Sequence, residues 1–388
     1  MKISSTVEDM PPSGIRVFFD LVLGMKDVIS LGVGEPDFVT PWNVREKAIY
    51  ALEEGYTSYT SNKGMIELRR EISKYLKRRY GLDYDPEEEI LITVGVSEAF
   101  DLSLRAVVER GDGVLIPEPA YVSYSPITML CGGRPMHIRT SPESGFKVTP
   151  KDILRTCDKK TKAMILNYPN NPTGASYSRK ELKEIAEVIR RRDLVMISDE
   201  IYCDLTYDFD HVPFAALPKM KERTIYLNGF SKSFAMTGWR IGYACGPAKL
   251  IAGMTKIHQY TMLCASIISQ MAAEEALKVG ESSVQEMKRE YRRRREFVVS
   301  RLNEIGLSCH KPEGAFYAFP SIKGTGLSSM DFSKGLLKSQ KVAVVPGTAF
   351  GPLGEGYIRI SYASGYEKLK EAFVRMESFV RGAAARVK

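Results

Sequence analysis

Short apolar runs alternate with amphipathic helical patterns through the middle of the chain, from residue 90 to about residue 230. Each run has the length of a strand, and the patterns between the runs place apolar residues at helical spacing. Buried parallel strands are typically continuous apolar runs, and the helices that connect them cover both faces of the sheet. We therefore predict an α/β fold in which helices flank a mainly parallel sheet built from the runs EILITV, GVLIPE, KAMILNY, LVMISDE and RTIYLNG.

The last hundred residues follow a different pattern. A long basic helical stretch is followed by short apolar segments and by a closing helix from Glu367 to about Val380. This order is typical of a smaller α+β unit, and a chain of 388 residues usually divides into two domains. We predict a large domain over residues 45–275 and a small domain made from residues 1–44 and 276–388.

The net charge of +8 is concentrated in the basic runs KRRY (77–80), RRR (190–192) and RRRR (292–295). The last run lies in a helical pattern that also contains glutamates at positions 286, 290 and 296. We interpret it as the solvated face of a long helix; the alternative is a nucleic-acid patch. No recognisable nucleic-acid-binding motif accompanies the run, so we expect no nucleic-acid partner.

Cysteine and histidine usage argues against disulfides and metals. The six cysteines form no C-x-x-C pair, and no two of the four histidines have the spacing of a helical metal site. We expect reduced thiols and no bound metal. The N-terminus lacks the apolar core of a signal peptide, and no apolar stretch is long enough to cross a bilayer. We therefore expect a cytoplasmic protein without a membrane partner.

Residues with reactive or polar side chains follow each predicted strand. A glycine turn begins at Gly95, and the next strands lead to Tyr121, to Asn171, to Asp199 and to Lys232. In open α/β sheets, ligands bind beyond the carboxyl ends of the strands, where these positions meet. The sequence therefore predicts a single site that combines a phosphate-type turn, an aromatic ring, an amide, a carboxylate and a lysine.

Lys232 lies in the segment NGFSKSFAMTGWRIGY, which is rich in small and apolar residues. One interpretation is an ion-paired lysine that extends to solvent. The other is a lysine whose pKa is lowered by its surroundings, so that the neutral amine can form a Schiff base with a carbonyl. The neighbouring residues, taken singly, are also open to ordinary explanations. Asp199 could be a loop acid or helix cap, Tyr121 a core aromatic and Arg359 a strand residue in a surface ion pair.

The lysine segment resembles the signature S-K-x-x-x-x-x-G-x-R of class I aminotransferases, with Ser231 and Lys232 followed by Gly238 and Arg240. Five further blocks occur in that family's order, so the resemblance runs from about residue 15 to the end. The chain is most similar to the subgroup of prokaryotic aspartate, aromatic and N-acetyl-diaminopimelate aminotransferases. The resemblance implies a fold type I enzyme that depends on pyridoxal 5'-phosphate (PLP). The blocks are GEPDF (34–38), Y-x-x-x-x-G (59–64), NNPTG (170–174), DEIY (199–202) and RISYA (359–363).

The resemblance implies roles at the cofactor ring, which the large domain would bind. Lys232 would hold the cofactor covalently and then move the proton at the substrate Cα. Asp199 would pair with the pyridine nitrogen and keep it protonated, so that the ring withdraws electrons. Asn171 and Tyr202 would hydrogen-bond the ring hydroxyl, and Tyr121 would stack on the ring face.

The resemblance also implies a phosphate site. Arg240 and Ser231 would bind the phosphate by charge-assisted hydrogen bonds. The backbone amides of Gly95, Val96 and Ser97 lie at a predicted helix start, which suits the same anion. Some family members have a serine or threonine three residues before the lysine, where this chain has Gly229, so one phosphate contact is expected to be missing.

Substrate and partner follow from the same resemblance. Arg359 would bind the substrate α-carboxylate in bidentate fashion, with Asn171 beside it. Gly34 lies in a loop expected to close over the substrate. Tyr59 would reach the phosphate of the neighbouring subunit, which implies a homodimer with shared active sites.

The implied reaction moves an amino group from an amino acid to a 2-oxo acid in two half-reactions, which predicts ping-pong kinetics. Ser97 stands where aspartate-preferring relatives often have a lysine, and Phe18 and Phe19 lie near the usual substrate-entry segment. The resemblance implies aspartate, an aromatic amino acid or a related one as the amino donor, with 2-oxoglutarate and glutamate as the second pair. Within that class these residues favour an apolar or aromatic side chain over strict aspartate specificity. The alternatives are a carbon–sulfur β-lyase on the same scaffold and a regulator with an aminotransferase-like domain. Only about 14 residues precede the fold, so we do not favour the regulator.

Overall fold

A seven-stranded sheet forms the centre of the molecule. The computed structural model describes residues 2–12, 14, 15, 22 and 24–384. The strand order is β2-β8-β7-β6-β5-β3-β4, and only β8 runs against its neighbours. The predicted mainly parallel sheet is therefore confirmed. Its strands are β2 (Ile90–Thr93), β3 (Gly113–Glu118), β4 (Arg134–Arg139), β5 (Thr161–Asn167), β6 (Val195–Asp199), β7 (Thr224–Gly229) and β8 (Gly242–Cys245).

The five predicted apolar runs all form strands of this sheet, within a residue or two of the expected bounds. Two strands were missed by the sequence reasoning. The edge strand β4 alternates buried and exposed side chains and so has no continuous apolar run. The strand β8 is only four residues long and begins within the end of the lysine segment.

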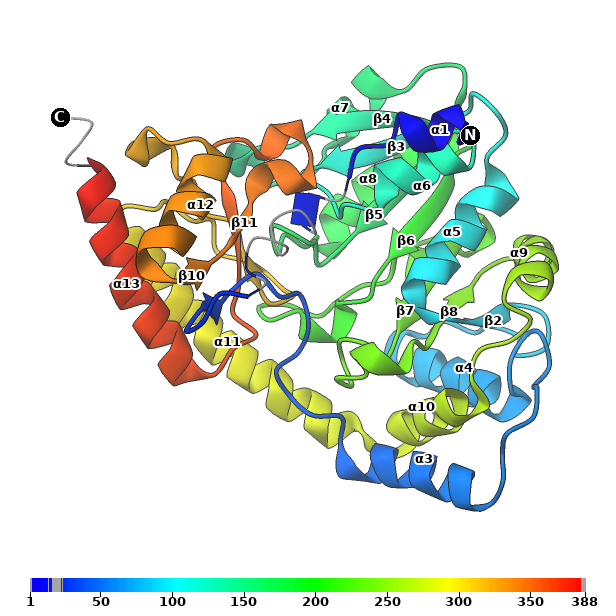
Figure 1. Cartoon of the computed structure of the whole chain (residues 1–388). Coiled ribbons are helices and arrows are strands. Elements are labelled where there is room, and N and C mark those ends of the chain that lie inside the picture. Colours follow the sequence, from blue (N-terminus) through cyan, green and yellow to red (C-terminus); the bar gives the residue numbers. More distant parts are fainter. Residues whose placement is uncertain (1, 13, 16–21, 23, 385–388) are drawn as a thin grey trace.

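Helices cover both faces of the sheet (Figure 1). Within β5, Ile165 packs into the core beneath α5 and α9, whereas Met164 and Leu166 pack into the core beneath α8. This alternation follows from the two-residue period of a strand and makes the central strands apolar on both sides. The helices of this part are α3 (Trp42–Glu53), α4 (Ile66–Tyr80), α5 (Gly95–Val107), α6 (Tyr124–Leu130), α7 (Pro150–Thr156), α8 (Arg179–Arg191), α9 (Ala248–Thr261) and α10 (Ile267–Val279).

The C-terminal elements form a second group, shown in orange and red in Figure 1. A three-stranded antiparallel sheet has the order β11-β12-β9, and β1 pairs in parallel with β10. The segment around β1 therefore lies against C-terminal elements, whereas α1 (Ser5–Glu8) lies against α6 beside the large sheet (Figure 1). The domain boundaries themselves stay a prediction. The elements of the second group are β9 (Tyr317–Ala318), β10 (Val342–Ala343), β11 (Val345–Pro346), β12 (Ile358–Ser361), α12 (Ser329–Gln340) and α13 (Tyr366–Ala384), together with β1 (Ile29–Ser30).

The long helix α11 (Glu281–Glu304) carries the RRRR run and extends from α10 to α13 (Figure 1). The interpretation of this run as a solvated face holds for Arg292 and Arg293, whose side chains are more than half exposed. It is wrong for Arg294 and Arg295, which are buried. These two side chains form ion pairs with aspartates from other segments, a pairing that the local spacing of charges does not reveal.

Among the described residues, no helix combines the length and hydropathy needed to span a membrane. The same part of the chain contains no group of three or more histidine, cysteine, aspartate or glutamate side chains arranged to hold a metal ion.

Candidate active site

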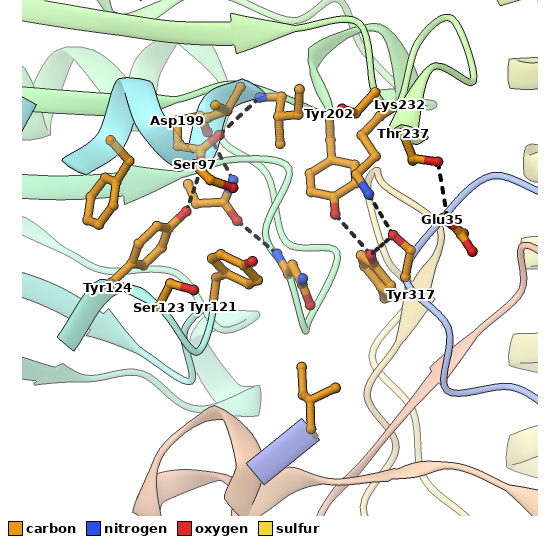
Figure 2. Close-up of a pocket in the computed structure, with 18 of the residues that line it drawn as sticks. Glu35, Ser97, Tyr121, Ser123, Tyr124, Asp199, Tyr202, Lys232, Thr237 and Tyr317 are labelled. Atoms are coloured by element: carbon orange, nitrogen blue, oxygen red, sulfur yellow. Dashed lines mark hydrogen bonds between the residues drawn. The ribbon is translucent and has the colours of Figure 1, made fainter. Parts of the chain in front are cut away.

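A cavity of about 460 Å³ lies at the carboxyl ends of the central strands, between the large sheet and the C-terminal elements. Figure 2 shows many of its side chains pointing toward a common space. The residues predicted for the site that line this cavity are Gly34, Val96, Ser97, Tyr121, Asn171, Asp199, Tyr202, Ser231, Lys232, Arg240 and Arg359. Residues from seven segments of the sequence are thus brought together, and five of these segments follow the strands of the predicted order.

Lys232 follows β7 and extends into the cavity. Its Nζ donates a hydrogen bond of 2.5 Å to the Gly34 carbonyl oxygen, as the dashed line in Figure 2 shows. Burial and the neighbouring cations Arg359 and Arg240, opposed by Glu35 and Asp199, lower the pKa of the Lys232 amine to about 8. About a tenth of the amine is therefore neutral and nucleophilic at pH 7.

Asp199 is the last residue of β6 and is buried. Its carboxylate accepts hydrogen bonds from the Tyr124 hydroxyl at 2.7 Å and from the Ile201 backbone amide at 3.2 Å. Burial raises the pKa of Asp199 to about 6, although both hydrogen bonds act to lower it. The carboxylate forms no ion pair with any described residue. A buried acid without a cation is suited to a ligand that supplies one.

Arg359 lies on β12 and is 2% exposed. Its Nη1 donates to Asn171 Oδ1 at 3.0 Å, its Nη2 donates to the Gly32 carbonyl oxygen, and its Nε has no hydrogen-bond partner. The guanidinium stacks on the Tyr317 ring at 4.5 Å. Within the described part of the chain no carboxylate pairs with Arg359, and burial lowers its pKa. A buried, unpaired guanidinium is suited to bind the carboxylate of a ligand.

Asn171 is held in place by the backbone around it. Its amide N–H donates to Asn167 Oδ1 at 2.9 Å, and the Asn167 side chain donates to the Asp199 carbonyl oxygen at 3.0 Å. The ends of β5 and β6 therefore fix the position of the amide that meets Arg359. Asn167 was not among the predicted site residues, although it lies within the predicted strand KAMILNY and is the last residue of β5.

The turn from β2 into α5 packs closely against Arg240. Gly95 has a φ of +74°, and a Cβ at this position would lie 2.8 Å from Arg240 Nη2. A Cβ on Gly242 would lie 2.8 Å from the Val96 nitrogen. Only glycine allows these close approaches. They place the N-terminus of α5 beside the Arg240 guanidinium, and this pair of positive groups forms a cradle suited to an anion. Gly95 borders this cradle but does not itself line the cavity.

Gly229, where some family members have a hydroxyl side chain, is tightly packed. A Cβ there would lie 3.0 Å from the Gly242 Cα and 3.2 Å from Val96 Cγ2. The backbone of β7 and β8 therefore leaves little room for a serine or threonine at this position.

Tyr202 and Tyr317 share a hydrogen bond of 2.9 Å between their hydroxyls, and the Tyr317 hydroxyl also donates to the Gly34 carbonyl at 3.3 Å (Figure 2). A Cβ on Gly34 would lie 2.7 Å from this hydroxyl. Sequence reasoning missed Tyr317, together with Tyr124 and Glu35, which also line the cavity. Tyr124 lies three residues after Tyr121 at a helix start, a spacing that could have indicated it.

The structure does not bring Tyr59 into the cavity of its own chain. The residue lies in the loop between α3 and α4 and is 82% exposed. Phe18 and Phe19 lie outside the described residues. Ile15, just before them in the sequence, does line the cavity.

In this fold a lysine and a buried guanidinium, which pairs with no carboxylate of the described residues, line one cavity at the carboxyl ends of the strands. The chain belongs to the aminotransferase class I and II family, whose profile matches residues 26–375, and it is an aminotransferase.

Individual relatives are similar to this protein over nearly the whole of its chain. It is 55% identical to the "Putative aminotransferase YugH" of Bacillus subtilis, covering 97% of this chain and 98% of that protein. It is 48% identical to an aspartate aminotransferase of Pyrococcus abyssi, covering 98% and 99%. The crystal structure of an aromatic aminotransferase from Pyrococcus horikoshii superposes with a TM-score of 0.90 at 47% identity, covering 95% and 99%.

These matches confirm the predicted fold type and subgroup. A further relative at 45% identity is the "Probable N-acetyl-LL-diaminopimelate aminotransferase" of Bacillus subtilis. The matches confirm transamination as the reaction class and do not favour the β-lyase alternative.

Proposed function

We propose that this aminotransferase uses PLP to move the α-amino group of an amino acid to a 2-oxo acid, with Lys232 as the cofactor-binding residue. One arrangement supports this most strongly. A lysine with a lowered pKa, a buried acid without a cation and a buried guanidinium without an acid line one cavity. Each of the three lacks a partner that the cofactor or substrate would provide.

The residues present fit the cofactor. Lys232 supplies the amine for its aldehyde, and Asp199 supplies the carboxylate for its ring nitrogen. The phosphate would be held by Arg240, by Ser231 and by the turn at Gly95, Val96 and Ser97. Tyr121 would stack on the ring, while Asn171 and Tyr202 would hydrogen-bond the ring hydroxyl. When bound, the cofactor supplies an electron-withdrawing ring that stabilises negative charge at the substrate Cα.

The side chains of this protein would bind the substrate and move its protons. Arg359 binds and orients the substrate α-carboxylate, and Asn171 fixes the guanidinium. Lys232, once its amine is free, would act as the base that moves the proton at the substrate Cα. Asp199 would keep the ring nitrogen protonated through its negative charge, and Tyr124 holds Asp199 in position.

We propose an apolar or aromatic amino donor, with 2-oxoglutarate and glutamate as the second pair. The cations that line the described cavity are Lys232, Arg240 and Arg359, and each already has a role. Ser97 offers no charge to a second carboxylate on the donor. Ile15 and Ile127 add apolar lining. Exclusive use of aspartate in an activity panel would contradict this assignment.

We propose a homodimer in which Tyr59 reaches the cofactor phosphate of the neighbouring subunit. The loop that carries Tyr59 is tied to the end of α9, because Asn62 Nδ2 donates to the Leu263 carbonyl oxygen at 2.8 Å. Large apolar side chains on α3, on this loop and at the end of α9 are unusually exposed, which is typical of an interaction surface. They are Trp42, Leu52, Tyr59, Tyr260 and Met262.

We also propose that the enzyme acts in the cytoplasm. Its six cysteines are all free, and the buried Cys203 and Cys245 have a raised pKa because of burial. Free thiols are typical of a reducing compartment.

The proposed function is tested by mixing the purified enzyme and PLP with single amino acids. Each true donor should bleach the visible band of the lysine-bound cofactor while the band of the aminated cofactor rises. Initial rates at varied donor and acceptor should give parallel double-reciprocal lines; intersecting lines would contradict the two half-reactions. Release of pyruvate and ammonia from a cysteine conjugate without an acceptor would instead support the lyase.

A further inference from the structure

Arg294, on α11, holds an aspartate from a distant part of the chain. Its Nη1 donates to both carboxylate oxygens of Asp37, at 2.8 and 2.9 Å, and its Nε donates to Glu290 at 2.9 Å. Its side chain is only 7% exposed. A buried ion pair recovers its desolvation cost only with good geometry, and here one guanidinium is bound by two carboxylates.

Asp37 belongs to the segment of residues 31–40, here named the substrate loop, which lies against the cavity. The loop carbonyls of Gly32 and Gly34 accept hydrogen bonds from Arg359 and Lys232. Two of the three cations that line the cavity, Lys232 and Arg359, therefore donate hydrogen bonds to the backbone of the loop. A shift of the loop would displace groups that bind the substrate and the cofactor.

The loop is fixed from two sides. On the side of the lysine segment, the Thr237 hydroxyl donates to Glu35 Oε2 at 3.1 Å and the Thr40 hydroxyl donates to the Ala235 carbonyl at 2.7 Å. On the opposite side, Asp37 binds Arg294. The same Nη1 approaches the Tyr362 carbonyl at 3.4 Å, three residues after Arg359. Arg294 thus connects the loop to the segment that follows β12.

We propose that Arg294 is a positioning residue for transamination: through Asp37 it fixes the substrate loop, so that the loop carbonyls hold Lys232 and Arg359 in their working positions. The proposal rests on the proposed roles of these two cations. Arg294 would thus contribute to substrate binding, although the local sequence of the RRRR run suggests only exposed surface charge.

Arg295, the next residue on α11, offers a matched control. It is fully buried and binds both carboxylate oxygens of Asp208, at 2.5 and 2.8 Å, and the Pro312 carbonyl at 2.8 Å. Asp208 lies outside the substrate loop and does not line the cavity. Removing Arg295 therefore breaks an equally buried ion pair on the same helix without releasing the loop.

The experiment compares Arg294→Met with Arg295→Met in the PLP-loaded enzyme. Initial rates with L-phenylalanine or L-aspartate and 2-oxoglutarate give kcat and KM, and thermal unfolding gives Tm. We expect both variants to lower Tm. Only Arg294→Met should lose about a hundredfold in kcat/KM, mostly as a rise in KM, because a displacement of about 1 Å can have an effect of this size. Arg294→Lys, which keeps a charge near Asp37, should recover part of the loss.

A double-mutant cycle tests whether Arg294 acts through Asp37. Asp37→Asn is nearly isosteric and keeps the second contact of Arg294 to Glu290, so it provides a second variant if Arg294→Met fails to fold. The double variant should lose little more kcat/KM than Arg294→Met alone, because both changes remove one connection. Additive losses would overturn the proposal, and so would equal losses of kcat/KM in Arg294→Met and Arg295→Met. A wild-type enzyme that transaminates no amino acid would instead overturn the proposed function.

Discussion

The Tyr124 hydroxyl donates a hydrogen bond of 2.7 Å to the Asp199 carboxylate in a region that excludes solvent. Burial raises the pKa of Asp199 to about 6, and the hydrogen bond from Tyr124 limits this rise because it stabilises the ionised form. The proposed role of Asp199 requires the carboxylate to be ionised. Tyr124 therefore determines how far into the acidic range the enzyme can work.

Replacing Tyr124 by phenylalanine should move the acidic limb of the kcat/KM profile to higher pH by about one to two units, since a hydrogen bond to a charged group contributes about 1.5–3 kcal/mol. Without the hydroxyl, the pKa of Asp199 rises, so the active carboxylate is lost at a higher pH as the solution is acidified. Tyr84→Phe is the control, because the buried Tyr84 hydroxyl has no hydrogen-bond partner. An unchanged profile for Tyr124→Phe would contradict this role.

Replacing Arg359 by lysine should lower kcat/KM by about a hundredfold. The change removes the planar pair of donors and leaves a point charge, and the lost charge-assisted hydrogen bond corresponds to about 3 kcal/mol. Steady-state rates with the donor that the amino-acid panel identifies provide the measurement. Retention of more than about half of the wild-type kcat/KM would show that another group binds the α-carboxylate.

The cofactor-free enzyme should bind PLP covalently at a rate that rises with pH, with a midpoint at about pH 8. Burial lowers the pKa of Lys232 to about 8, and only the neutral amine attacks the aldehyde. Stopped-flow absorbance at a series of pH values measures this rate. Arg359→Gln should move the midpoint to higher pH, because Arg359 is a positive charge that lowers the pKa of Lys232. A midpoint near that of an exposed lysine would contradict the assignment.

Mixed dimers test the shared active site. Lys232→Ala and Tyr59→Ala should each be weakly active or inactive alone, because the first lacks the cofactor-binding amine and the second lacks the proposed contact to the phosphate of the neighbouring subunit. A hybrid dimer contains one site with Lys232 from one chain and Tyr59 from the other, so partial unfolding and refolding of the two variants together should restore activity. If mixing restores none while both variants remain dimeric, Tyr59 does not act across the interface.

The sequence predicted the residues that line the site, but it did not predict the side chains that hold those residues in place. Asp199 and Lys232 could be found because parallel strands end at one edge of the sheet, so residues far apart in the chain were expected to meet. Tyr124 and Tyr317 were missed because their significance depends on which side chain they contact, and an ordinary core tyrosine has the same local pattern. Arg294 was misinterpreted for a related reason, since its partner Asp37 is 257 residues away.

The most direct test of the central claim is reduction of the PLP-loaded enzyme with borohydride, followed by digestion and peptide mass spectrometry. Reduction makes the bond between lysine and cofactor permanent. The account predicts that the added mass of the reduced cofactor is found on the peptide containing Lys232 and that Lys232→Ala carries none. Labelling of a different lysine, or no labelling of an enzyme that still transaminates, would contradict it.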